Sequence, residues 1–88
     1  MKRWTQIFKA LSNINRVRII KILSGNDRMN VSEIANELDI SLKATSKHLI
    51  ILHNLDVLSN KGKDSRVEYW LNPDLPASAR EQAIEKLT

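Results

Sequence analysis

The chain contains no cysteine, which excludes disulfide bonds, thiolate metal sites and thiol redox sensing within these residues. It also has only two glycines and two prolines among 88 residues, and it shows no glycine-rich phosphate loop, no internal repeat and no long linker. A nucleophile elbow and a paired-carboxylate signature are missing as well. We therefore expect no enzymatic activity and no cofactor.

Long apolar runs are absent too. No uninterrupted run approaches the length that crosses a membrane, and the basic first residues lack the apolar core and cleavage site of a signal peptide. The expected location is the cytoplasm, with no membrane partner. Residues 1–88 are expected to form one small domain, which buries only a limited part of its surface. Oligomerisation is a natural way for such a chain to bury more.

Positive charge predominates, with fourteen Lys and Arg against ten Asp and Glu and a net charge of +4. A basic domain attracts polyanions such as nucleic acid, although total charge alone is a weak indicator. The distribution says more, because basic residues outnumber acidic ones between positions 42 and 66, whereas Glu81 and Glu85 lie near the C-terminus. The basic residues of that stretch are Lys43, Lys47, Lys61, Lys63 and Arg66.

The first part of the chain predicts two helices. Residues 5–11 place apolar side chains at helical spacing. A second helix begins after Asn13, which caps it, and ends at Gly25. A turn follows, and residues 28–30 suit a short extended segment.

Residues 31–55 predict two short helices joined by a tight turn. Asn30 and Glu33 have the spacing of a capping box, which opens the first of the two helices. The turn falls at residues 39–40, and Ser41 caps the second helix, which runs to the end of this range. This layout is typical of a helix-turn-helix, in which the second helix enters the major groove of DNA.

The second of these helices has two different faces. Thr45, Leu49 and Leu52 fall on one face and are expected to pack on the preceding helices. Another face carries lysines that can reach phosphates or guanine, short hydroxyls that suit phosphates, and small apolar groups that can meet thymine methyls. The alternative is an ordinary solvated helix face. The candidate DNA-binding residues on this helix are Ser41, Leu42, Lys43, Ala44, Ser46 and Lys47.

A β-hairpin with a basic tip is predicted next. Residues 57–61 and 66–71 have strand character, with residues 62–65 as the turn between them. After a break marked by two prolines, residues 77–87 predict a last helix. The basic groups of the hairpin can lie on phosphates or enter the minor groove; alternatively, they keep an edge hairpin soluble. These groups are Lys61, Lys63 and Arg66.

The predicted fold is therefore mainly α-helical with a small β-hairpin, in the order helix, helix, helix, helix, strand, strand, helix. With the segments FKALSNINRVRIIKIL (residues 8–23) and VSEIANELDISLKATSKHLIIL (residues 31–52), it resembles the winged helix-turn-helix repressors of the ArsR/SmtB family. The most distinctive elements are Ala10-Leu11-Ser12 and Ser46-Lys47-His48-Leu49. The resemblance covers roughly residues 5–72, and it implies a DNA-binding transcriptional repressor.

Three positions depart from the family pattern. Ile14 stands where the family usually has proline, and Asp56 where it usually has glycine; aspartate tolerates the left-handed conformation better than most residues. Leu42 stands where glutamine is frequent, so a base preference is not carried over from relatives. The residue matching His48 belongs to the family's fold motif, where it packs or binds a phosphate, and we add His48 to the candidate DNA contacts.

The family's two metal sites are not expected here. Many relatives carry a Cys-x-Cys element on the third helix, and the matching residues are Asn30 and Ser32. A second family site uses histidine and carboxylates on the last helix, but residues 75–88 contain no histidine. His48 and His53 are five residues apart, which is not the spacing of a helical ligand pair.

The resemblance implies a homodimer formed by the first and last helices, because a two-fold repressor needs paired recognition helices. The apolar residues of these helices exceed what a solvent face requires. The alternative is that they cover the core of their own domain. The candidate interface residues are Trp4, Ile7, Phe8, Ala83, Ile84 and Leu87.

The sequence thus predicts a homodimeric regulator, a repressor, that binds double-stranded DNA sequence-specifically. The main alternative is a winged-helix module whose basic face binds an acidic protein. An effector, either a small molecule or a partner protein, is a further possibility that keeps the DNA-binding function. A metal sensor with an unusual site is the third alternative.

Overall fold

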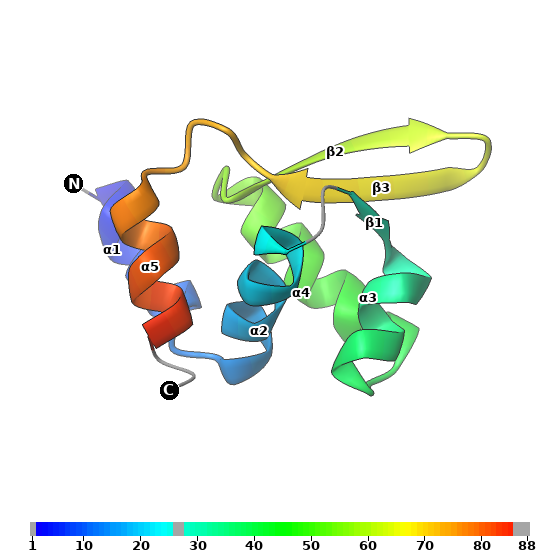
Figure 1. Cartoon of the computed structure of the whole chain (residues 1–88), viewed down its shortest axis with the longest axis horizontal. Helices are drawn as coiled ribbons and strands as arrows, with labels where there is room; N and C mark the ends of the chain where they lie inside the picture. The colour runs from blue at the N-terminus through cyan, green and yellow to red at the C-terminus, as the bar shows by residue number, and fades with distance from the viewer. Residues whose placement is uncertain (1, 26–27, 86–88) are drawn as a thin grey trace.

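The computed structural model describes residues 2–25 and 28–85, without the side chains of residues 2–4, 63 and 84. Five helices surround a core, and a three-stranded antiparallel sheet extends from it (Figure 1). The predicted order of helices and hairpin is confirmed, with one short strand added before the third helix. The elements are α1 (Lys2–Ala10), α2 (Ile14–Ser24), β1 (Met29–Asn30), α3 (Val31–Leu38), α4 (Leu42–Asn54), β2 (Leu58–Lys63), β3 (Arg66–Leu71) and α5 (Ala77–Glu85).

Side chains cap three of the helices, as the sequence predicted. Asn13 Oδ1 accepts a hydrogen bond from the backbone N–H of Asn15 at 2.9 Å and opens α2. At α3, Asn30 Oδ1 accepts from the Glu33 N–H, and Glu33 Oε1 accepts from the Asn30 N–H, both at 2.9 Å. Ser41 Oγ accepts from the Ala44 N–H at 3.0 Å and opens α4. These bonds satisfy backbone donors that have no partner within the helix.

An aspartate in the left-handed conformation follows each of the two helices of the helix-turn-helix, α3 and α4. Asp39 has φ 56° and follows α3, and Asp56 has φ 59° and follows α4. After each of them the chain folds back in the same way: the Ile40 N–H donates to Ala35 O, and the Val57 N–H donates to Leu52 O. This is the Schellman arrangement, which usually places glycine at the left-handed position.

The hairpin differs from the predicted one at its tip. Strand β2 continues to Lys63, which pairs with Arg66, and Gly62 lies inside the strand opposite Val67. The turn consists of two residues, Asp64 and Ser65, with φ 48° and 62°. Two consecutive positive φ values define a type I′ turn, whose twist matches that of the flanking strands. The predicted turn over residues 62–65 was therefore too long. We call this hairpin, residues 58–71, the wing.

The core lies between α2, α3, α4 and the base of the wing. Ile19, Ile34, Leu49 and Leu52 each have 0% exposure. Thr45 is equally buried, and its hydroxyl donates to Ser41 O at 2.9 Å, which satisfies the polar group. The predicted inner face of α4 is therefore confirmed. Helix α5 packs against α2 on the far side from the wing, beside α1 (Figure 1).

Candidate DNA-binding surface

Arg18 joins α2 to the end of α3 and thereby fixes the helix-turn-helix. Its Nη1 donates to Leu38 O at 3.3 Å, and its Nη2 donates to Glu37 O at 3.4 Å. A cation at this position also meets the negative end of the α3 dipole. Although Arg18 is basic, backbone carbonyls of the same chain already accept hydrogen bonds from its guanidinium. We therefore do not include Arg18 in the candidate DNA-binding surface.

The outer face of α4 carries the predicted recognition residues. Leu42 is 56% exposed, and Ser41, Lys43 and Lys47 are exposed as well. Ala44, Ser46 and His48 are half-buried along the edges of this face. The buried side of the helix fixes its position, so these side chains are presented on a rigid element.

Ile50 belongs to the same face, although the sequence analysis did not select it. It is 54% exposed, and it follows Lys43 and Lys47 at helical spacing. The pattern of positions 43, 47 and 50 was visible in the sequence. From the sequence alone, however, an isoleucine at this spacing is equally compatible with a buried core residue. Its exposure shows that the outer face contains an apolar group beyond the lysines.

His48 lies where α4 meets α2. Burial lowers the pKa of the His48 imidazole below its ordinary value of 6.5, and the positive charge of Arg16 lowers it further. The Nδ1 atom of His48 is buried and has no hydrogen-bond partner among the described residues. The His48 imidazole therefore takes up a proton less readily than a free imidazole does.

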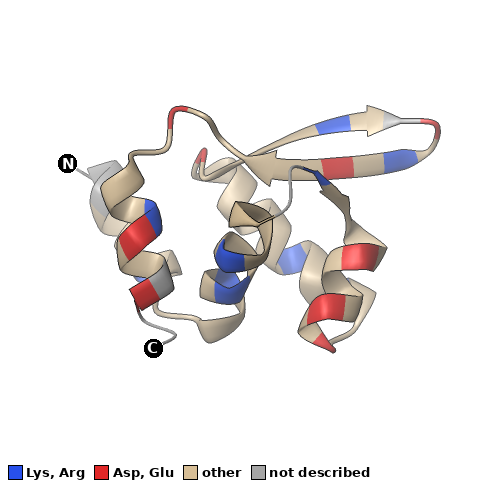
Figure 2. Cartoon of the chain, viewed as in Figure 1, with Lys and Arg blue, Asp and Glu red and all other residues tan. Residues whose placement is uncertain are grey.

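The wing has basic residues on both strands, together with acidic residues on β3 and in the turn (Figure 2). Lys61 and Arg66 are exposed, and the register places Lys61 opposite Glu68. At the tip, Lys63 and Arg66 are direct cross-strand partners, although the side chain of Lys63 lies outside the described part.

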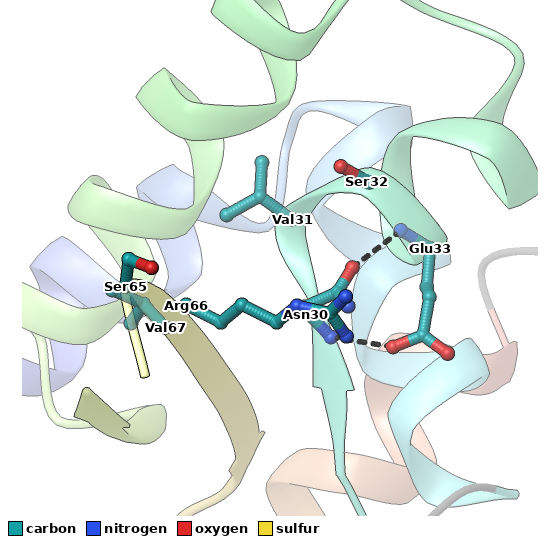
Figure 3. A pocket seen from close by; sticks show the side chains of 7 residues that line it. All are labelled: Asn30, Val31, Ser32, Glu33, Ser65, Arg66 and Val67. Atoms are coloured by element: carbon teal, nitrogen blue, oxygen red, sulfur yellow. Dashed lines mark hydrogen bonds between the residues drawn. The ribbon is translucent and has the colours of Figure 1, made fainter. Parts of the chain in front are cut away.

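A surface hollow of about 410 Å³ separates the wing from the start of α3. Figure 3 shows Asn30, Val31, Ser32 and Glu33 on one side of it, and the Arg66 side chain stretched across it. Asn30 and Ser32 are the residues that the sequence analysis matched to the family's Cys-x-Cys element, and the Asn30 side chain is engaged in the capping box. Among the described residues, no three His, Cys, Asp or Glu side chains form a metal-binding group.

The predicted interface residues divide into three sets. Ile7 and Ala83 are 5% and 0% exposed within a single chain, so both already belong to the core of their own domain. Phe8 is 47% exposed. The side chains of Trp4 and Ile84, and the whole of Leu87, lie outside the described part of the chain.

None of the described helices combines the length and the apolar character that a membrane-spanning helix needs.

The fold and this surface define a winged helix-turn-helix domain. Residues 13–60 match the model of the bacterial regulatory protein arsR family, and the chain belongs to this family. The resemblance noted from the sequence is thereby confirmed. The family and the relatives found are transcriptional regulators and not enzymes, which agrees with the sequence prediction.

Two relatives illustrate the similarity. The chain is 38% identical over 66 residues to the transcriptional repressor SdpR of Bacillus subtilis, a match that covers 75% of this chain and 72% of that protein. It is 40% identical over 63 residues to the cadmium resistance transcriptional regulatory protein CadC of Listeria innocua, covering 72% of this chain and 52% of that one. The chain thus spans about half the length of CadC.

Solved structures share the fold. HlyU from Vibrio cholerae superimposes with a TM-score of 0.79 at 26% identity, over 98% of this chain and 88% of that one. A homodimeric winged helix-turn-helix DNA-binding domain from Mycobacterium bovis gives a TM-score of 0.78 at 19% identity, over 98% and 76%.

Proposed function

We propose that this chain is a homodimeric repressor that binds a specific double-stranded DNA sequence. The outer face of α4 carries this proposal: two exposed lysines and an exposed leucine are held on a helix whose opposite face is fully buried. Lysines at this position contact phosphates or guanine, and Leu42 meets thymine methyls. The wing supplies further phosphate contacts through Lys61, Lys63 and Arg66.

Dimerisation would place two copies of α4 in successive major grooves, about 34 Å apart on a near-palindromic site. The homodimeric state of the Mycobacterium bovis domain supports this arrangement. Phe8, which is 47% exposed on α1, is the described apolar residue that fits an interface with a second copy. Trp4, Ile84 and Leu87 stay predictions for the same interface.

We further propose that the family's two metal sites do not operate in this chain. Asn30 and Ser32 offer an amide and a hydroxyl where the Cys-x-Cys element would offer thiolates. Release from DNA would then depend on a different signal, such as a small molecule or a partner protein. Retention of zinc, nickel or copper in equilibrium dialysis would contradict this part of the proposal.

The first experiment measures fluorescence anisotropy with a labelled duplex from the chain's own upstream region and with a scrambled duplex, at two salt concentrations. Tighter binding to the upstream duplex, weakening as salt rises, is the expected result. Equal binding to both duplexes would contradict sequence-specific recognition of that region. Absence of binding to either would favour the module that binds an acidic protein.

A Lys47→Ala variant tests the recognition helix directly. Lys47 is exposed on the outer face of α4, and its loss should weaken duplex binding about tenfold without unfolding the domain. Lys21→Ala is the matched control, because Lys21 is equally exposed but lies on α2, outside the proposed surface. A folded Lys47→Ala protein with unchanged affinity would show that α4 is not the recognition helix.

A further inference from the structure

The residue types on α4 limit how its outer face can read bases. Between Leu42 and Ile50 the helix carries no Arg, Asn, Gln, Asp or Glu, which are side chains that pair with guanine, adenine or cytosine in the major groove. Apart from one half-buried histidine, lysines, short hydroxyls and apolar groups remain. Lysine reads guanine, and an apolar group reads the C5-methyl group of thymine. The apolar side chains of this face can therefore distinguish thymine from the other bases.

Ile50 is an apolar side chain that α4 holds outside the core. It is 54% exposed, whereas Leu49 and Leu52 on the same stretch of helix are both 0% exposed. The helix is therefore fully packed at this level, and Ile50 lies away from the packed side. A single exposed isoleucine is common on protein surfaces, so the groups beside it decide what it can do.

Lys43, Lys47 and Ile50 share one face of α4. With 3.6 residues per turn, these three positions fall within about 60° around the helix axis. Seven residues separate Lys43 from Ile50, which is about 10.5 Å along the axis, and this is less than the width of the major groove, about 12 Å. When the two lysines face the floor of the groove, Ile50 is therefore still inside it.

The charges around Ile50 favour DNA as its partner. Lys43 and Lys47 are exposed on the same face, and no acidic residue occurs within α4. An apolar protein that covered Ile50 would have to remove water from these lysines, which is costly without paired charges. The major groove offers phosphates and guanine acceptors to the lysines and methyl groups to the isoleucine.

We infer that Ile50 packs on the C5-methyl group of a thymine and makes α4 selective for thymine at that base pair. This inference rests on the proposed function, and it adds a second methyl contact to that of Leu42. Eight residues, about 12 Å along the helix, separate Leu42 from Ile50. That distance exceeds about three base-pair steps, so the two residues meet different base pairs.

The test removes thymine methyl groups one at a time. A duplex that the wild type prefers is first selected from a random pool, and each thymine is then replaced by deoxyuridine, which pairs in the same way but lacks the C5-methyl group. One replacement should weaken binding by the wild type about fourfold, because one buried methyl contact is lost. The same replacement should leave the affinity of Ile50→Ala unchanged.

Two control variants accompany Ile50→Ala. Ile14→Ala shortens an isoleucine that is 56% exposed on α2, outside the proposed surface, and it should keep the wild-type affinity and every methyl sensitivity. Leu42→Ala should lose sensitivity at a different thymine. Ile50→Ala itself should bind the unmodified duplex at least about fourfold more weakly than the wild type. Both isoleucine variants should keep the wild-type thermal midpoint, because the side chains lie at the surface. Should Ile50→Ala fail to fold, Ile50→Val, which removes one methyl group, gives the same comparison.

The outcomes separate this inference from the proposed function. If Ile50→Ala keeps every methyl sensitivity of the wild type while Lys47→Ala loses affinity, Ile50 does not read thymine and the recognition helix stands. A wild type that is insensitive to every replacement would also overturn the inference. If selection yields no preferred duplex, or if Lys47→Ala binds like the wild type, the proposed function itself fails.

Discussion

Arg16 and Arg18 show how two identical residues on one helix acquire different roles. Both lie on α2, and the sequence presents them simply as part of a basic stretch. Arg18 is directed at the carboxyl end of α3, where backbone carbonyls hold its guanidinium. The Nε atom of Arg16 has no hydrogen-bond partner among the described residues, and the positive charge of Arg16 helps to lower the pKa of His48. Arg18 therefore joins two helices through hydrogen bonds, whereas the described side-chain hydrogen bonds include none from Arg16.

The surroundings of His48 make stability depend on pH. Its pKa is lower in the folded chain than the ordinary value of 6.5, through burial and the Arg16 charge. The unfolded chain therefore binds more protons as pH falls through and below that value, and the stability of the folded state decreases. We expect the free energy of unfolding, measured with urea, to decrease between about pH 7 and about pH 5.5.

His48→Gln should flatten this decrease, because the titrating group is removed. His53→Gln is the control, since it deletes the other histidine of the chain. A wild-type slope that persists in His48→Gln would show that a different group is responsible.

Helix ends were the elements that the sequence specified best. Asn13, Asn30 and Ser41 all cap helices where their spacing predicted, because capping is decided by a few neighbouring residues. The tip of the wing was predicted less well. A turn built from Asp64 and Ser65, both at positive φ, lacks the glycine that normally marks it.

The residues of the candidate site show the same contrast: local patterns were predicted well from the sequence, and contacts between distant segments were not. The outer face of α4 followed from helical periodicity, a local property. The effect of Arg16 on His48 could not be found in this way, because the two residues lie on different helices. Ile7 and Ala83 have the apolar pattern of interface residues, yet they are buried within one chain, and periodicity does not distinguish the two kinds of burial.

The capping box makes the start of α3 sensitive to one substitution. Asn30→Ala removes the acceptor of the Glu33 N–H and should cost about 1 kcal/mol of stability. For a domain of this size that is a fall of about 4–8 °C in thermal midpoint. Ser32→Ala, at an exposed neighbouring position, should change the midpoint little. Equal midpoints for Asn30→Ala and wild type would show that the capping box does not stabilise the domain.

The molecule as a whole has its two proposed functions at opposite ends. Helices α1 and α5 lie at one end, and the wing extends from the other (Figure 1). This separation allows two copies to associate through α1 and α5 while both wings remain accessible. In the proposed dimer, DNA binding by two recognition helices would depend on contacts far from either of them.

Phe8→Glu tests this arrangement. A charge on the 47% exposed Phe8 should weaken self-association at least about tenfold, because it would be desolvated at the interface. Sedimentation velocity over a range of concentrations measures the change. Val67→Glu, on the wing, alters another exposed apolar residue and should leave the association constant unchanged. If Phe8→Glu associates like the wild type, the interface lies elsewhere.

The tight turn of the wing limits how its reach can change during evolution. Strands β2 and β3 are paired without interruption from Leu58 and Leu71 to Lys63 and Arg66. Side chains alternate between the two faces, so one inserted residue would move every residue beyond it to the opposite face. Inserting one cross-strand pair extends the hairpin by only about 3.4 Å, and two pairs, about 7 Å, restore the same face at the tip. Descendants of this chain can therefore lengthen the wing in paired steps while preserving the orientation of its basic groups.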